Sequence, residues 1–145
     1  MNKSDADAAM SVFKARCEEH GLRVTPQRTL IYQELIKAED HPSVDVLYKR
    51  VRKTHPNISF DTVFRTVQSF SQMSLVGVCG GYGGPKRFDP IMKKHHHFIC
   101  MSCDKIIDFY SEPCDNIQIP KSIQKKYNIL NKKVVLEGFC PECQK

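Results

Sequence analysis

The chain has 145 residues, of which 41% are hydrophobic and 26% are charged, with a formal net charge of +6. This composition is typical of a soluble globular protein with one domain or two small ones, and no apolar run reaches the ~20 residues of a membrane helix. The acidic N-terminal residues lack the apolar segment of a signal peptide, so a cytoplasmic location without membrane contact is expected, and the seven cysteines are expected to remain reduced or to bind metal.

The N-terminal half is predicted to be helical, because helix-start signals recur along it. Residues 5–20 carry a modest apolar stripe that predicts a first helix. Thr25, Ser43 and Ser59 each precede a segment with helical spacing of apolar residues, and each can cap the helix that follows. Four helices are therefore expected before residue 75.

The last of these helices has a polar stripe and leads into a hairpin. The stripe comprises Thr62, Arg65, Ser69 and Gln72. The following segment, "LVGVCGGYGGPKRFD", has two strand-like runs around Gly-rich turn chemistry, and its return strand carries Lys86 and Arg87. Short helices followed by a hairpin predict a winged helix-turn-helix, which binds DNA. The stripe alone fits an amphipathic surface helix equally well, and the basic hairpin favours DNA binding.

The composition of the chain changes after residue 88. Two strand-like runs surround a first Cys-x-x-Cys, a short helix follows, and a third strand leads into a second Cys-x-x-Cys. We predict an α+β protein with a winged-helix domain over residues 1–88 and a small α/β domain over residues 89–145. A domain of that size is hard to stabilise by apolar burial alone, so a bound metal is expected to contribute.

The two Cys-x-x-Cys pairs predict a structural zinc site. Two such pairs supply four thiolates, which complete a tetrahedral zinc ion and leave no open coordination position. The predicted ligands, one zinc per chain, are Cys100, Cys103, Cys140 and Cys143. Cys17, Cys79 and Cys114 stand alone, and each is interpreted as a buried or incidental thiol.

The run "HHH" at residues 95–97 points to a second, separate site. Side chains alternate along a strand, so His95 and His97 are expected on one face and His96 on the other. A histidine run without any ligand role is the simpler alternative, and spacing does not exclude it. If a site exists, its further ligands must come from residues such as His41, Asp89 and Asp108. Imidazole and carboxylate ligands suit Fe2+ or Mn2+.

These motifs together resemble the ferric uptake regulator family. "GLRVTPQR", "HPNISFDTVFRTVQSF", "KRFDP", "HHHFICMSCDKIIDF" and "GFCPEC" occur in the order and spacing of that family, over residues 8–143. The resemblance implies a winged helix followed by a dimerisation domain. It also implies a homodimeric, metal-dependent repressor that binds an AT-rich palindromic DNA operator, rather than an enzyme.

The resemblance also assigns ligands. The four paired cysteines match the structural zinc site of the family. The regulatory site of its peroxide-sensing branch is matched by His41, Asp89, His95, His97 and Asp108. In that branch Fe2+ or Mn2+ is bound there, one per chain, and His41 and His95 match the histidines that peroxide oxidises.

Aspartate at positions 89 and 108 resembles the peroxide-sensing branch, whereas iron-uptake regulators more often have glutamate there. Many iron-uptake regulators have an additional metal site, but Lys94, His96 and Lys132 stand at its positions. Zinc-uptake regulators often use a cysteine in the sensing site, and none is recognised in this sequence. Iron-uptake and zinc-uptake regulation remain alternatives within the family.

Candidate DNA contacts follow from the predicted winged helix. Base contacts are expected from Thr62, Phe64 and Arg65, and backbone contacts from Arg23, Arg28, Lys86 and Arg87. Phe64 replaces a tyrosine that is usual in the family, so it can contact a thymine methyl group but cannot donate a hydrogen bond. Two alternatives from other classes are a metallohydrolase, for which no general-base motif is found, and a zinc-stabilised protein-interaction module.

Overall fold

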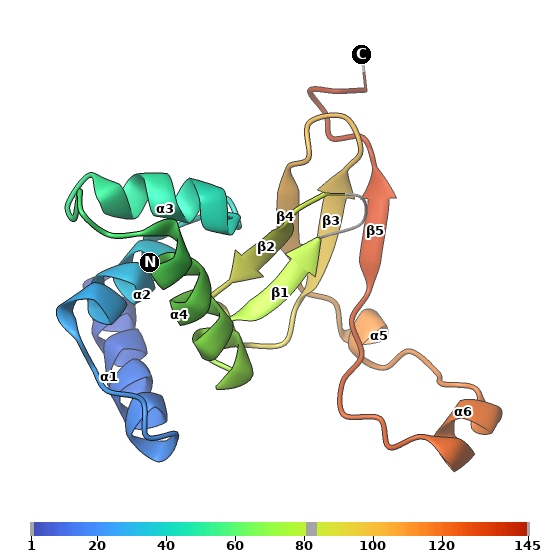
Figure 1. Ribbon diagram of the computed structural model, residues 1–145. Helices are drawn as coiled ribbons and strands as arrows, with labels where there is room; N and C mark the ends of the chain where they lie inside the picture. The colour runs from blue at the N-terminus through green and yellow to red at the C-terminus, as the bar shows by residue number, and fades with distance from the viewer. Residues whose placement is uncertain (1, 81–83, 145) are drawn as a thin grey trace. The chain divides into compact units, whose positions relative to one another are not determined.

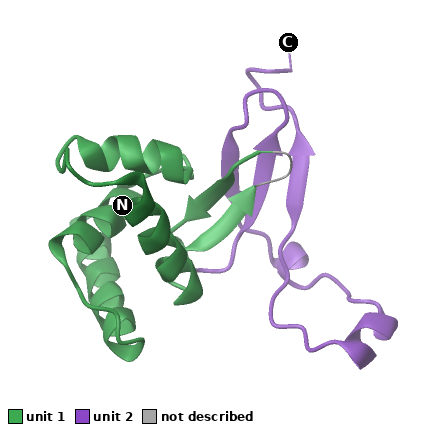
Figure 2. Ribbon diagram, viewed as in Figure 1, with its two compact units in different colours: residues 1–92 green, residues 93–145 purple. Residues whose placement is uncertain are grey.

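Four helices and a hairpin form the first of two structural units, residues 1–92, and a three-stranded sheet with two short helices forms the second, residues 93–145 (Figures 1 and 2). The computed structural model describes residues 2–80 and 84–144. Along the chain, the division between the units falls between residues 92 and 93, a few residues beyond the predicted boundary between residues 88 and 89. That the two units carry separate functions stays a prediction.

The predicted helices of unit 1 are present, and the predicted caps begin the second, third and fourth of them. The helices are α1 (Lys3–Glu19), α2 (Pro26–Lys37), α3 (Val44–Arg52) and α4 (Phe60–Gln72). The side chains of Thr25, Ser43 and Ser59 each accept a hydrogen bond from the backbone amide three residues later. These caps satisfy amides that have no partner within the helix, which sets where each helix starts.

An aromatic cluster holds the helices of unit 1 together. The ring of Phe13 in α1 packs edge-on against Tyr32 of α2 and Phe70 of α4, with centroids 4.8 and 5.6 Å apart. Phe88, in the hairpin, joins the same buried core. The hairpin is therefore attached to the helices through apolar packing as well as through the chain.

The hairpin consists of β1 (Gly77–Gly80) and β2 (Lys86–Asp89), paired antiparallel as predicted. Its predicted turn includes residues 81–83, which lie outside the described residues. Phe88 and Asp89 are buried, whereas Lys86 is exposed. Helices followed by this hairpin confirm the predicted winged-helix arrangement of unit 1.

Unit 2 is a small α/β unit, as the sequence predicted. Its strands are β3 (His96–Cys100), β4 (Ile106–Phe109) and β5 (Val135–Gly138), and its helices are α5 (Glu112–Asp115) and α6 (Lys121–Lys126). The sheet order is β4-β3-β5, with β3 antiparallel to β4 and parallel to β5. The four-residue helix α5 was not predicted.

Unit 2 buries few apolar side chains. Among its described residues the buried hydrophobic side chains are Cys100, Ile106 and Cys140, and two of these are predicted metal ligands. Leu130 and Phe139 remain 89% and 56% exposed. Apolar burial therefore contributes little to the stability of this unit as a single chain. No helix among the described residues has the length and apolar character needed to cross a membrane.

Candidate metal centres

Parallel pairing of β3 and β5 brings the two Cys-x-x-Cys segments to the same end of the sheet. Cys100 ends β3 and pairs with Gly138 at the end of β5, so the turns that follow both strands are neighbours. The amide of Met101 donates to the carbonyl of Gly138, which joins the two turns at 2.7 Å. Each Cys-x-x-Cys motif therefore supplies two cysteines to the same site.

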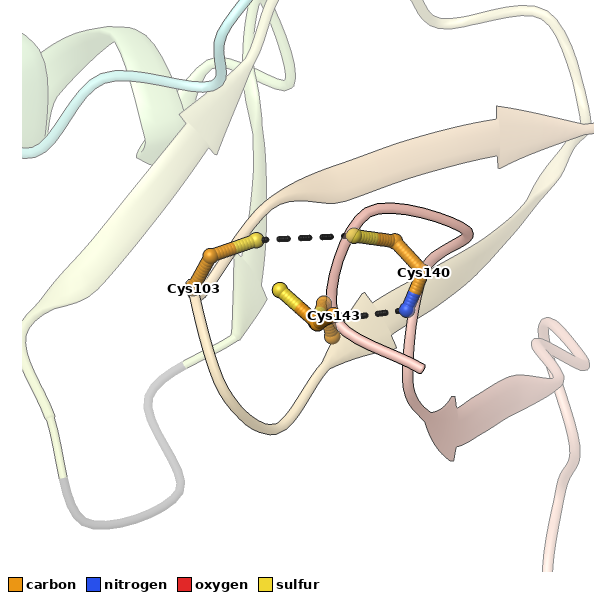
Figure 3. Close-up of side chains that lie close together, drawn as sticks. Cys103, Cys140 and Cys143 are labelled. Carbon is orange, nitrogen blue, oxygen red and sulfur yellow. Dashed lines mark hydrogen bonds between the residues drawn. The ribbon is translucent and has the colours of Figure 1, made fainter. Parts of the chain in front are cut away.

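The four cysteines have the spacing of a tetrahedral zinc site. One sulfur atom from each of Cys100, Cys103, Cys140 and Cys143 lies within 4.8 Å of the others. Figure 3 shows the Cys103, Cys140 and Cys143 side chains converging, and the Cys103 and Cys140 sulfurs are 3.9 Å apart. Zinc–sulfur bonds of ~2.3 Å place tetrahedral ligands about 3.8 Å apart, so the group fits zinc.

The backbone around the first cysteine favours its thiolate. The amides of Cys103 and Cys140 are the main influences that lower the pKa of the Cys100 thiol, to about 6. The Cys140 amide donates directly to the Cys100 sulfur at 3.4 Å. Because the thiolate is the form that binds zinc, the backbone favours the ligand state of Cys100 before any ion arrives, whereas the pKa values of Cys103 and Cys143 are raised.

The three consecutive histidines point in alternate directions, as predicted, with His95 directly before β3 and His96 and His97 within it. The Nε2 atoms of His95 and His97 lie 3.1 Å apart. His96 points to the other face, where its Nε2 donates to Asp115 at 2.7 Å. Its Nδ1 accepts from the amide of Val134, and because an amide only donates, the proton of this neutral ring is on Nε2. Both ring nitrogens of His96 thus bind protein groups away from His95 and His97.

Within unit 2, His95, His97 and Asp108 form a cluster of nitrogen and oxygen donors. Asp108 of β4 pairs with His97 across the sheet, and its Oδ1 lies 3.1 Å from His97 Nε2 and 3.7 Å from His95 Nε2. Two adjacent ligands of an octahedral ion with bonds of ~2.1 Å are about 3.0 Å apart. The separations of His97 from His95 and from Asp108 match this spacing, and that of His95 from Asp108 is longer. Their nitrogen and oxygen donors suit an ion such as Fe2+ or Mn2+.

A carbonyl oxygen prepares His95 for metal binding. Its Nδ1 lies 2.6 Å from the carbonyl oxygen of Lys93, which can only accept a hydrogen bond. The Nδ1 atom therefore carries the proton, and the lone pair is on Nε2, the atom that faces His97 and Asp108. This arrangement orients the ring and raises its basicity as a ligand.

Within unit 1, His41 and Asp89 form a second pair of donors. His41 Nε2 lies 3.7 Å from Asp89 Oδ2, and both side chains are buried. The amide of Ile91 donates to Asp89 Oδ1 at 2.9 Å, which orients the carboxylate. The five residues assigned from the family resemblance therefore form two groups, one in each unit, and each has donor chemistry suited to a hard divalent ion.

The DNA-contact candidates on α4 are accessible. Phe64 is 45% exposed and stacks on Phe60, while the Arg65 guanidinium pairs with Asp61 at 2.9 Å on the surface. Thr62 is half-buried, and its hydroxyl lies 2.8 Å from that of Ser59. A surface hollow of about 390 Å³ is lined by Thr25, Gln27, Arg28, Asp61, Thr62, Arg65 and Thr66.

Two of the predicted basic contacts are already engaged with backbone. Arg28 Nη1 donates to the carbonyl of Arg23 at 2.6 Å. Arg87 donates to the carbonyls of His41 and Asp40 at 2.5 and 2.7 Å. Arg87 thus holds the segment that carries a predicted metal ligand, a role that the sequence did not reveal. Its DNA contact stays a prediction.

Comparison with known proteins identifies the family of this chain and several similar proteins. The model of the ferric uptake regulator family matches residues 19–137. The chain is 31% identical to the peroxide operon regulator of Bacillus subtilis over 128 residues, 88% of either chain. Its fold resembles the Helicobacter pylori ferric uptake regulator, with a TM-score of 0.80, 21% identity and coverage of 97% and 94%. For the Vibrio cholerae ferric uptake regulator the TM-score is 0.67, at 28% identity and coverage of 86% and 96%.

Proposed function

The chain belongs to the ferric uptake regulator family, and from this premise we propose that it is a cytoplasmic, metal-dependent transcriptional repressor that responds to peroxide. The observation that carries the proposal is the pair of nitrogen-and-oxygen donor groups, His41 with Asp89 in unit 1 and His95, His97 and Asp108 in unit 2. The similarity to the Bacillus subtilis peroxide operon regulator supports the response to peroxide.

In this proposal, the two donor groups bind one Fe2+ or Mn2+ ion together. These five residues would hold the ion, and a bound Fe2+ would supply the electrons that reduce peroxide. The zinc site formed by the four cysteines is separate and structural. Its ligand set is closed, so it stabilises unit 2 and takes no part in sensing.

A shared ion couples metal binding to DNA binding. Ligands from both units complete the site only in the arrangement where the two groups meet, so the ion stabilises that arrangement by its differential affinity. Loss of any ligand removes this preference. We propose that the arrangement with metal bound presents α4 to the major groove and the β1–β2 hairpin to the DNA backbone.

The unit 2 surface supports the proposed homodimer. Ile107, Leu130, Leu136 and Phe139 are all exposed on this unit, at 41%, 89%, 49% and 56%. Ile107 and Leu136 both pair with Phe98 and so share one face of the sheet, and exposed apolar surface that is contiguous marks an association site in soluble proteins. A dimer would present two copies of α4, which suits a palindromic and, by family expectation, AT-rich operator.

The shared ion is tested by removing one ligand from each group. His41→Ala and Asp108→Ala should each weaken Mn2+-dependent binding to operator DNA by about 100-fold or more, because either change leaves an incomplete site. DNA binding is measured by fluorescence anisotropy over a Mn2+ titration, with chelator as the metal-free reference. His20→Ala and Asp7→Ala, both exposed on or near α1, are matched controls. Wild-type Mn2+ dependence in either ligand variant would contradict a shared site.

The two classes of DNA contact have different signatures. Arg65→Ala should lower affinity for the operator more than for random duplex, if this side chain leaves Asp61 to read a base edge. Lys86→Ala should weaken binding to both duplexes alike, because the lysine side chain neutralises one phosphate in either. The slope of log affinity against log salt concentration should fall by about one unit. Equal losses on both duplexes for Arg65→Ala would remove Arg65 from base recognition.

A further inference from the structure

Cys79 lies on the face of the hairpin that carries a proposed metal ligand. In the β1–β2 register Cys79 pairs with Arg87, and Gly77 pairs with Asp89. Residues two apart on a strand share a face, as do directly paired residues, so Cys79 and Asp89 are diagonal neighbours on one face. Gly77, the residue paired with Asp89, has no side chain on that face.

The segment before α3 places His41 over this face. The amide of Phe88 donates to the carbonyl of Pro42 at 3.0 Å, and the Arg87 side chain donates to the carbonyls of His41 and Asp40. His41 adopts a φ of 50°, which costs a residue with a side chain about 1 kcal/mol or more. These hydrogen bonds from β2 hold the segment in that conformation and attach His41 to the strand that carries Asp89.

As a result, a thiol and an imidazole are close together in a buried place. The Cys79 sulfur and a ring nitrogen of His41 lie within 4.8 Å of each other, and Cys79 and His41 are 7% and 6% exposed. Tetrahedral zinc with bonds of ~2.3 Å to sulfur and ~2.05 Å to nitrogen would hold them about 3.6 Å apart, which lies within that limit. A buried cysteine is commonly an apolar filler. Here it lies close to one potential ligand, His41, and shares a face of the hairpin with another, Asp89.

We propose that Cys79 is a sixth potential ligand of the regulatory site and its sulfur donor. Through His41 and Cys79 the site can then bind a thiophilic ion such as Zn2+, and through its nitrogen and oxygen donors it can bind Fe2+ or Mn2+. Thiolate ligands favour zinc, whereas imidazole and carboxylate ligands accept manganese and iron. The inference rests on the proposed function, because it concerns the same site. It makes Cys79 a residue that determines metal selectivity, so zinc at this site would give a repressor that peroxide does not inactivate.

The test compares metal affinities in Cys79→Ser, using the full-length chain with its four-cysteine site already filled with zinc. Binding of further Zn2+ should weaken at least tenfold more than binding of Mn2+, because serine removes the sulfur donor. Co2+ provides a direct probe, since a thiolate ligand gives a near-ultraviolet charge-transfer band. That band should appear in the wild-type protein and in Cys114→Ser, and should be absent in Cys79→Ser and reduced in His41→Ala.

Equal losses of Zn2+ and Mn2+ affinity, or a cobalt–thiolate band that persists in Cys79→Ser, would overturn the proposal. If Cys79→Ser does not fold, the proposal is tested instead by alkylating the cysteines of the wild-type protein with and without added Zn2+. Added Zn2+ should then slow alkylation of Cys79 but not of Cys114, and equal rates would count against the inference. The proposed function fails by a different result. In that case the wild-type protein would bind DNA equally well with and without Mn2+.

Discussion

Cys140→Ser should yield a protein that lacks zinc, has an unfolded unit 2 and does not dimerise. Structural zinc contributes on the order of 10 kcal/mol to folding in small domains, whereas the described part of unit 2 buries only Cys100, Ile106 and Cys140 as apolar side chains. The loss therefore exceeds what the remaining contacts can replace. Zinc content by mass spectrometry, circular dichroism and gel filtration measure the three parts of this expectation.

A matched control separates zinc loss from a general effect of replacing cysteine. Cys114→Ser changes a half-buried thiol of α5, which belongs to none of the potential metal-binding groups among the described residues. This variant should keep one zinc per chain and remain dimeric. A folded, dimeric Cys140→Ser protein without zinc would show that the thiolate cluster is not needed to stabilise unit 2.

Peroxide should add one oxygen atom to His41 or His95 in the Fe2+ form and release the operator. In the Mn2+ form both histidines should stay unmodified and the operator should stay bound. His95 has Nε2 directed at the proposed ion, and the orienting hydrogen bond from its Nδ1 to Lys93 keeps it there. An oxidised imidazole is a poorer ligand, so the ion loses a ligand from one of the two units and binds that unit more weakly. Mass spectrometry of peptides that span residues 41 and 95 measures the modification, alongside DNA binding by anisotropy.

The neighbouring His96 is an internal control in the same peptide. Its ring points away from His95 and His97 and binds Asp115 and Val134, so fragmentation should locate the added oxygen on His95 rather than on His96. DNA release with both His41 and His95 unmodified would instead favour regulation by reversible loss of iron, as in an iron-uptake regulator. Equal oxidation of the Fe2+ and Mn2+ forms would exclude a reaction that depends on iron.

Features encoded within one short segment could be predicted from the sequence. The caps at Thr25, Ser43 and Ser59 depend on a side chain and an amide three residues away, so local sequence is sufficient. The opposite orientations of His95 and His96 follow from the two-residue repeat of a strand. The spacing of the Cys-x-x-Cys pairs likewise indicated one four-cysteine group, because its donor chemistry is contained in two short motifs.

Features that depend on contacts between distant segments required the tertiary structure. The parallel pairing of β3 and β5 brings Cys100 and Cys140 together, and the approach of the segment before α3 to β2 places His41 beside Cys79. In the sequence, Cys79 stands alone, and no local signal indicates that Arg87 binds the segment that carries His41. Strand register and packing decide which distant residues meet, and neither propensity nor periodicity within a segment carries that information.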